Sequence, residues 1–159
     1  MGISVYRGRE GGEMFQGISY QTMDQKGRIA IPTRIREVLN SGGNGNIMVT
    51  HGISCLMAFS LEFWKIVVEK AASLATFDQR SRDFIRLFIA PAMECAPDRQ
   101  GRILIPSSLR EYGELDKDVV VAGMLKNFEI WDRKKFDAKM ESGRADQSFL
   151  LEGAGLLGL

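Results

Sequence analysis

The stretch Asp24-Gln25-Lys26-Gly27-Arg28-Ile29-Ala30-Ile31-Pro32 occurs a second time, as Asp98-Arg99-Gln100-Gly101-Arg102-Ile103-Leu104-Ile105-Pro106. In each copy the aspartate can accept hydrogen bonds from the backbone N–H groups just after it, and the glycine supplies the positive φ that closes a tight turn. The Ile-x-Ile alternation predicts a short strand, which the proline ends because it lacks an N–H for the ladder. Each copy should therefore present one arginine beside its turn. Arg28 lies beside the turn organised by Asp24, and Arg102 lies beside the turn organised by Asp98 and Gly101.

Similar patterns follow both copies of the motif. A short apolar helical face comes next, then two apolar runs that read as a hairpin, at 47–50 and 55–59 in the first copy and at 119–122 and 128–131 in the second. We therefore expect two related units with a helical link between them. The expected parts are a disordered extension (1–13), repeat 1 (18–61), a helical connector (62–91), repeat 2 (92–135), and a C-terminal helix with a flexible tail (136–159).

Composition places the chain among soluble globular proteins, with 159 residues, 45% apolar and 26% charged. Neither repeat is large enough to build a good core alone, so pairing of the two halves is expected. The fold class expected is mainly β with helices, α+β. The segment Phe84–Ile89 is apolar enough that we expect it to be buried. A small monomer cannot easily cover so much apolar surface, so we also expect a homo-oligomer.

Several kinds of chemistry find no support in the sequence. Cys55 and Cys95 are isolated and His51 is the one histidine, so we expect no metal site, no disulfide, no cofactor and no enzyme. The G-x-G-x-x-G match at 153–158 has no room for a following helix, and we interpret it as a chance match. No apolar run approaches the ~18 residues that span a bilayer and no signal peptide opens the chain, so we expect a cytoplasmic protein without a membrane partner.

Cations gather around both motifs, although the net charge is only +1. Arginine suits DNA because its planar fork can grip a phosphate or the edge of guanine. The alternative is that Arg28 pairs with Asp24, and Arg102 with Asp98, as staples across the turns, which does not exclude DNA contact. The candidate DNA-binding residues are Lys26, Gly27, Arg28, Arg34, Arg36, Arg99 and Arg102.

At these residues the sequence resembles the MraZ family, bacterial transcriptional regulators within the SpoVT/AbrB-like superfamily. The resemblance covers roughly residues 14 to 141 and rests on the Met-Phe-x-Gly start at Met14, the paired Asp-x-x-x-Arg motifs and the segment 128–131. It departs at Gln16, where members commonly have arginine, and the tail from Gly143 matches nothing usable.

The resemblance implies a tandem, pseudo-symmetric, double-split and swapped-hairpin β-barrel that assembles into rings. It also implies binding to repeated promoter sites in double-stranded DNA, upstream of the division and cell-wall gene cluster that includes the protein's own gene. We therefore expect a sequence-specific regulator, a repressor located in the cytoplasm and nucleoid. An antitoxin-like protein-interaction module is the alternative, although the short Gly-rich C-terminus offers no long acidic tail to wrap a partner.

Overall fold

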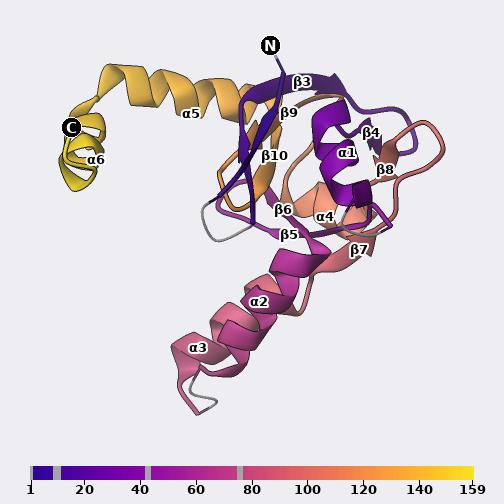
Figure 1. The fold of residues 1–159 in the computed structure, drawn as a ribbon, viewed down its shortest axis with the longest axis horizontal. Coiled ribbons are helices and arrows are strands. Elements are labelled where there is room, and N and C mark those ends of the chain that lie inside the picture. Colours follow the sequence, from indigo (N-terminus) through magenta and orange to yellow (C-terminus); the bar gives the residue numbers. More distant parts are fainter. Residues whose placement is uncertain (1, 9–11, 42–43, 75–76) are drawn as a thin grey trace.

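The computed structural model describes residues 2–8, 12–41, 44–74 and 77–159 (Figure 1). Its centre is a six-stranded sheet in the order β3-β9-β10-β6-β5-β7, accompanied by the two-stranded pairs β1-β2 and β4-β8. The strands are β1 (Ser4–Arg7), β2 (Glu13–Gln16), β3 (Ile18–Thr22), β4 (Arg28–Ala30), β5 (Ile47–His51), β6 (Leu56–Ser60), β7 (Met93–Cys95), β8 (Arg102–Leu104), β9 (Asp118–Gly123) and β10 (Phe128–Asp132). The helices are α1 (Thr33–Ser41), α2 (Leu61–Ala72), α3 (Gln79–Phe84), the π-helical segment Ile85–Ile89, α4 (Ser107–Tyr112), α5 (Arg133–Ala145) and α6 (Ser148–Leu156).

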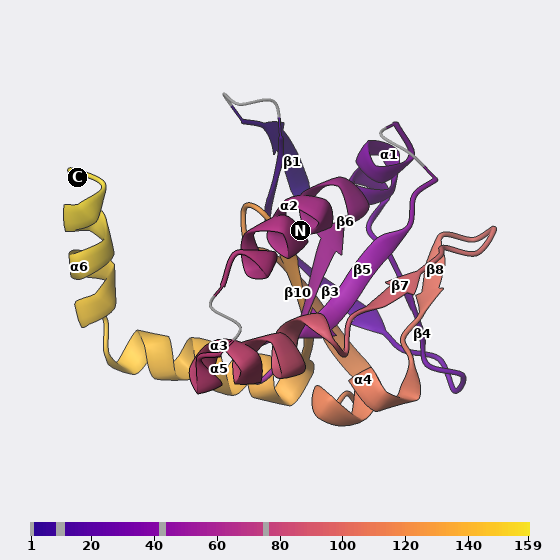
Figure 2. The ribbon, with the colours of Figure 1, turned by 90° about the horizontal axis from the view of Figure 1, so that it is seen from below.

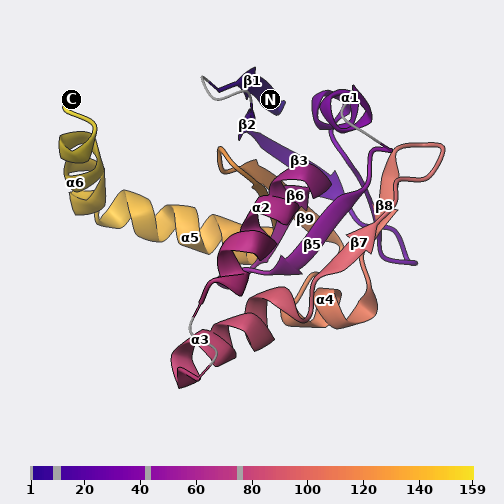
Figure 3. The same cartoon turned by 60° about the horizontal axis from the view of Figure 1, so that its bottom comes forward.

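The two halves exchange strands. The hairpins β5-β6 and β9-β10 form as expected, and they join through β6 and β10. Strand β3 precedes the first hairpin in the chain but pairs with β9 of the second, with Ile18 opposite Ala122. Strand β7 precedes the second hairpin but pairs with β5 of the first, with Ile47 opposite Cys95 (Figure 3). Each half of the chain therefore adds one strand to the hairpin of the other half within the same sheet.

The two motif strands, β4 and β8, pair with each other in an antiparallel ribbon centred on Ile29 and Ile103. Because they pair with each other and not with the large sheet, that sheet stays open at its edges β3 and β7 in the described part of the chain. The mixed α+β class is confirmed, whereas a closed barrel is not seen.

One hydrophobic cluster joins both halves. The inward face of the ribbon contributes Ile29 and Ile103, each fully buried, and Ile31 and Ile105 continue it. From the short helices that follow the motifs, Ile35 and Leu109 pack into the same cluster as the sheet residues. A shared core is therefore observed, as expected for two units that are each too small to fold alone.

The two ends of the chain contain more regular structure than expected. Where residues 1–13 were expected to be disordered, Ser4–Arg7 pairs with Glu13–Gln16 and Ile3 is buried; residues 1 and 9–11 lie outside the described set. Each of these two strands has only four residues, which is too short for a clear alternation of apolar and polar side chains. At the other end, α6 occupies part of the tail that was expected to be flexible, including most of the G-x-G-x-x-G match.

Helices α2 and α3 extend away from the sheet as an arm in Figure 1, and Figure 2 shows the same arm from below. Within it, Phe88 packs near Phe59 and Trp64, but Phe84 is 46% and Leu87 is 61% exposed. The expectation that the whole segment Phe84–Ile89 is buried is therefore wrong for the single chain, because the helical turn presents only one side to the sheet. Among the described residues, no helix combines the length and apolarity needed to cross a membrane.

Candidate nucleic-acid interface

Both motif turns are held by their aspartates in the same way. Asp24 Oδ1 accepts from the backbone N–H groups of Lys26 and Arg28, both at 2.9 Å, and Asp24 Oδ2 accepts from Arg28 Nε at 2.6 Å. In the second copy, Asp98 makes the equivalent bonds to Gln100 and Arg102, with Arg102 Nε at 3.0 Å. Gly27 and Gly101 adopt φ values of +90° and +76°, which only glycine reaches without strain. The turn chemistry predicted from sequence is therefore present.

The ribbon brings the two motifs together. Arg28 lies opposite Leu104, and Ala30 lies opposite Arg102. Because neighbours alternate between the two faces of a strand, these four side chains share the outward face, while the isoleucines point into the core. Arg102 Nη1 also lies 3.6 Å from Asp24 Oδ2, which is a direct contact between the motifs. Two arginines that are far apart in sequence thus form one surface.

Each turn is covered by an arginine from the other repeat. The ladder continues beyond the ribbon, because the Ile105 N–H donates to the Gly27 carbonyl and the Ile31 N–H donates to the Gly101 carbonyl. Each turn therefore lies against the helix start of the opposite half. A Cβ placed on Gly101 would overlap the guanidinium of Arg36, and a Cβ placed on Gly27 would overlap that of Arg110. Arg36 donates from Nε to the Ile31 carbonyl at 3.1 Å, whereas the buried Arg110 Nε has no hydrogen-bond partner in the described residues. Both arginines are half-buried parts of the scaffold.

The aspartates remain charged at neutral pH. The backbone N–H of Arg28 is the main reason that the pKa of Asp24 falls from 3.8 to about 2, with the Arg28 side chain and the Lys26 N–H adding to the effect. The pKa of Asp98 is lowered mainly by the backbone N–H of Arg102. The ion pairs therefore persist at neutral pH.

The pairing leaves part of each arginine fork available. Arg28 uses Nε for Asp24, and no hydrogen bond engages its two Nη groups within the described structure. About a third of each side chain is exposed, 31% for both Arg28 and Arg102. The Nη edge is a planar pair of donors that suits a phosphate or the O6/N7 edge of guanine. The staple and the ligand contact are therefore compatible.

Three further candidates are free and exposed. Lys26 lies in the first turn, Arg99 in the second and Arg34 in the first turn of α1. No side-chain hydrogen bond or ion pair involves them across residues 2–8, 12–41, 44–74 and 77–159. They add exposed positive charge in the two turns and at the start of α1, and exposed lysine and arginine side chains are the groups that contact phosphates.

Arg110 and Leu104 are not among the site residues predicted from the sequence. Arg110 stands 74 positions after Arg36, the same offset that separates Asp98 from Asp24, so the duplication carried a signal for its role. Leu104 is 52% exposed on the face of Arg28 and Arg102, and this follows only from the register of the ribbon.

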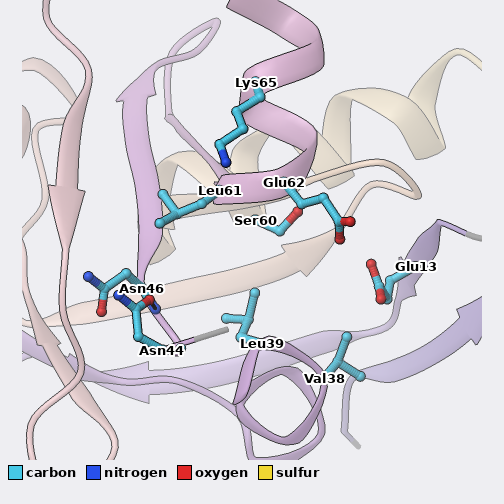
Figure 4. Close-up of a pocket in the computed structure, with 10 residues that line it drawn as sticks. Glu13, Val38, Leu39, Asn44, Asn46, Ser60, Leu61, Glu62 and Lys65 are labelled. Carbon is cyan, nitrogen blue, oxygen red and sulfur yellow. Dashed lines mark hydrogen bonds between the residues drawn. The ribbon is translucent and has the colours of Figure 1, made fainter. Parts of the chain in front are cut away.

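Other parts of the structure offer less defined chemistry. A pocket of about 370 Å³, shown in Figure 4, lies between α1 and the start of α2, and its charged lining residues are Glu13, Glu62 and Lys65. Its lining holds neither histidine nor cysteine. Among the described residues, no group of three or more His, Cys, Asp or Glu side chains could hold a metal ion.

The cysteines and the histidine have structural surroundings. Cys55 and Cys95 are buried and unpaired, and desolvation raises their thiol pKa values to about 12 and about 11. The His51 ring stacks on Tyr112 with centroids 3.7 Å apart, and desolvation lowers its pKa. Thiols of this kind are poor nucleophiles.

Known proteins match the chain over nearly its whole length. Residues 14–87 and 88–150 each match the family model described as "MraZ protein, putative antitoxin-like". A protein of Syntrophobacter fumaroxidans named transcriptional regulator MraZ is 40% identical over 145 residues, covering 89% of this chain and 97% of its own. Proteins of the same name from Carboxydothermus hydrogenoformans (45% identical; 76% and 82% covered) and Acetivibrio thermocellus (38%; 92% and 100%) also match. Since the family model matches both halves and the relatives align over most of their length, the chain belongs to the MraZ family.

Proposed function

We propose that this chain is a sequence-specific DNA-binding transcriptional regulator that contacts DNA with the outward face of the β4-β8 ribbon and its two turns. The observation that carries the proposal is the pair Arg28 and Arg102 on one exposed face, each held through Nε by the aspartate of its own turn. Within the described residues no hydrogen bond occupies the Nη groups of Arg28, whereas Arg102 Nη1 lies 3.6 Å from Asp24 Oδ2. Lys26, Arg34 and Arg99 add exposed charge around it. The name of the relatives, transcriptional regulator MraZ, supports the same function.

One subunit supplies few contacts, so useful affinity requires several subunits on repeated sites. The exposed apolar side chains of the α2-α3 arm, including Phe84 and Leu87, support a homo-oligomer. We propose that this homo-oligomer is a ring, as the resemblance to the family implies. The proposed targets are repeated sites upstream of the division and cell-wall gene cluster, including the protein's own gene, in the nucleoid, with repression as the outcome.

An antitoxin-like interaction module is the second candidate, since the description of the matching family model contains that term. The exposed apolar helix α6, with Leu151 79% and Leu156 90% exposed, offers a surface that a protein partner could cover. Under this alternative, truncation of α6 abolishes partner binding and leaves DNA binding unchanged.

The test is a footprint on the DNA upstream of the protein's own gene. The wild type should protect repeated short sites, and Arg28→Ala should weaken specific binding by about 1–3 kcal/mol, the value of a bidentate base contact. Arg144→Ala is the matched control, because it removes an equal charge from the exposed end of α5, where Arg144 pairs with Glu141. Equal footprints for Arg28→Ala and wild type would refute the role of the ribbon, and no protection at any concentration would refute the function.

A further inference from the structure

The outward face of the ribbon carries one large apolar side chain. Leu104 is 52% exposed directly opposite Arg28 and two residues along the strand from Arg102, although the opposite face of the same strands, at Ile29 and Ile103, is fully buried. A single exposed leucine is ordinary on a protein surface. This leucine is notable for its place, because it stands on the face that the proposed function directs toward DNA.

The dimensions of the ribbon fit a short run of bases. A two-stranded ribbon can enter the major groove. Arg28 and Arg102 occupy diagonal positions, which in an antiparallel pair are about 7–8 Å apart. That distance is roughly two base-pair steps of ~3.4 Å, so one base pair can lie between those that the arginines reach. Leu104 has no hydrogen-bonding group, and the C5 methyl group of thymine is the apolar feature of that groove.

The duplication makes this contact one-sided. The residue equivalent to Leu104 in the first copy is Ala30, which stands opposite Arg102 and is too short to extend beyond the guanidinium groups. We propose that Leu104 contacts the C5 methyl group of a thymine lying between the bases read by Arg28 and Arg102, and so determines which way round each subunit lies on its site. This inference rests on the proposed function and names the base that the same surface selects.

The experiment replaces thymine by uracil, which lacks only the methyl group. The probe is the duplex that the full-length wild-type protein selects from a random-sequence pool, with each thymine of a half-site replaced in turn. One replacement should weaken wild-type binding about fourfold, the equivalent of one buried methyl-sized group. Leu104→Ala should bind the thymine and uracil duplexes equally well.

Two controls separate this reading from general effects. Ile53→Ala removes an apolar side chain that is 90% exposed in the β5-β6 turn, and it should keep the full uracil effect. The double variant Ala30→Leu with Leu104→Ala should move the sensitive thymine to the symmetry-related position of the half-site. Thermal unfolding and light scattering of Leu104→Ala should match the wild type, because its side chain is exposed on the ribbon.

The outcomes distinguish a failure of the proposed DNA-binding function from a failure of the thymine contact by Leu104. If the wild type selects no duplex, the proposed function fails and the role of Leu104 fails with it. If a duplex is selected but no uracil replacement matters, or Leu104→Ala keeps the same uracil effect, thymine reading by Leu104 is refuted and the proposed function stands. A lower assembly mass for Leu104→Ala would assign this leucine to a subunit contact and would also overturn the inference.

Discussion

Replacing Gly101 by alanine should strain the second motif turn through two separate effects. Its φ of +76° lies in the left-handed region, where an L-residue costs roughly 1–2 kcal/mol. The new Cβ would also overlap the guanidinium of Arg36, which must move and give up its bonds to the Ile31 carbonyl (3.1 Å) and Thr33 Oγ1 (3.2 Å). A typical hydrogen bond contributes about 0.5–1.5 kcal/mol, and the exposed bond to Thr33 contributes less. Together with the backbone strain, we expect the free energy of unfolding to fall by about 2–4 kcal/mol.

The two effects can be separated with a double-mutant cycle in urea unfolding at fixed protein concentration. In an Arg36→Ala background, Gly101→Ala should cost only the backbone term of about 1–2 kcal/mol. Gly27→Ala provides the internal comparison, because the displaced Arg110 has no hydrogen bond at Nε to lose, so its cost should be smaller than that of Gly101→Ala. Gly153→Ala, where a Cβ meets nothing within 4 Å in α6, should be neutral or stabilising.

An equal loss of stability for Gly101→Ala with and without Arg36 would show that the overlap with this arginine has no energetic effect. Equal costs for Gly27→Ala and Gly101→Ala would likewise show that the hydrogen bonds of Arg36 contribute nothing to the turn.

Four further predictions concern charge and assembly. Asp24→Asn keeps an oxygen that can accept from the turn N–H groups but removes the oxygen that accepts from Arg28 Nε. The ratio of specific to non-specific DNA affinity should therefore fall in anisotropy titrations. An unchanged ratio would exclude positioning of the Arg28 side chain by Asp24. The pKa of Asp24 is about 2 in the folded protein and 3.8 ordinarily, so its contribution to stability is present above about pH 4 and is lost toward pH 2. Asp24→Asn should therefore flatten the dependence of the unfolding free energy on pH in this range. Light scattering at micromolar concentration should give a molecular mass that is a multiple of the 17.8 kDa of one chain, and the mass of a monomer would refute the proposed ring. Affinity for two tandem sites should peak near a spacing of ~10 bp, whereas equal affinity at every spacing would mean independent subunits.

The local structure of the motifs was predictable because it depends on neighbours in the sequence. An aspartate, a glycine three residues later, an Ile-x-Ile pair and a proline together specify turn, strand and helix start, and the structure confirms each of them in both copies. The hairpins likewise followed from apolar runs separated by short segments that contain a glycine, Gly52 in the first and Gly123 in the second.

The remaining features depend on contacts between distant segments, which a sequence pattern does not encode. The pairing of Ile29 with Ile103 decides that Arg28, Leu104 and Arg102 share a face, and nothing in either copy alone states that register. Arg36 looks like a free cation on a helix until the turn of the other repeat is placed beneath it. The segment Phe84–Ile89 was misjudged because helical periodicity shows which residues share a face but not whether another element covers that face.

The exchange of strands also constrains how a chain can fold while it is being synthesised. Strand β3 leaves the ribosome about 100 residues before its partner β9. At 5–20 residues per second, β3 waits roughly 5–20 s for its own β9. During that interval a β9 from a neighbouring chain on the same message can take its place, because an exchanged strand makes the same hydrogen bonds. The arrangement that joins the two halves of one subunit thus also exposes the nascent chain to entanglement with its neighbours.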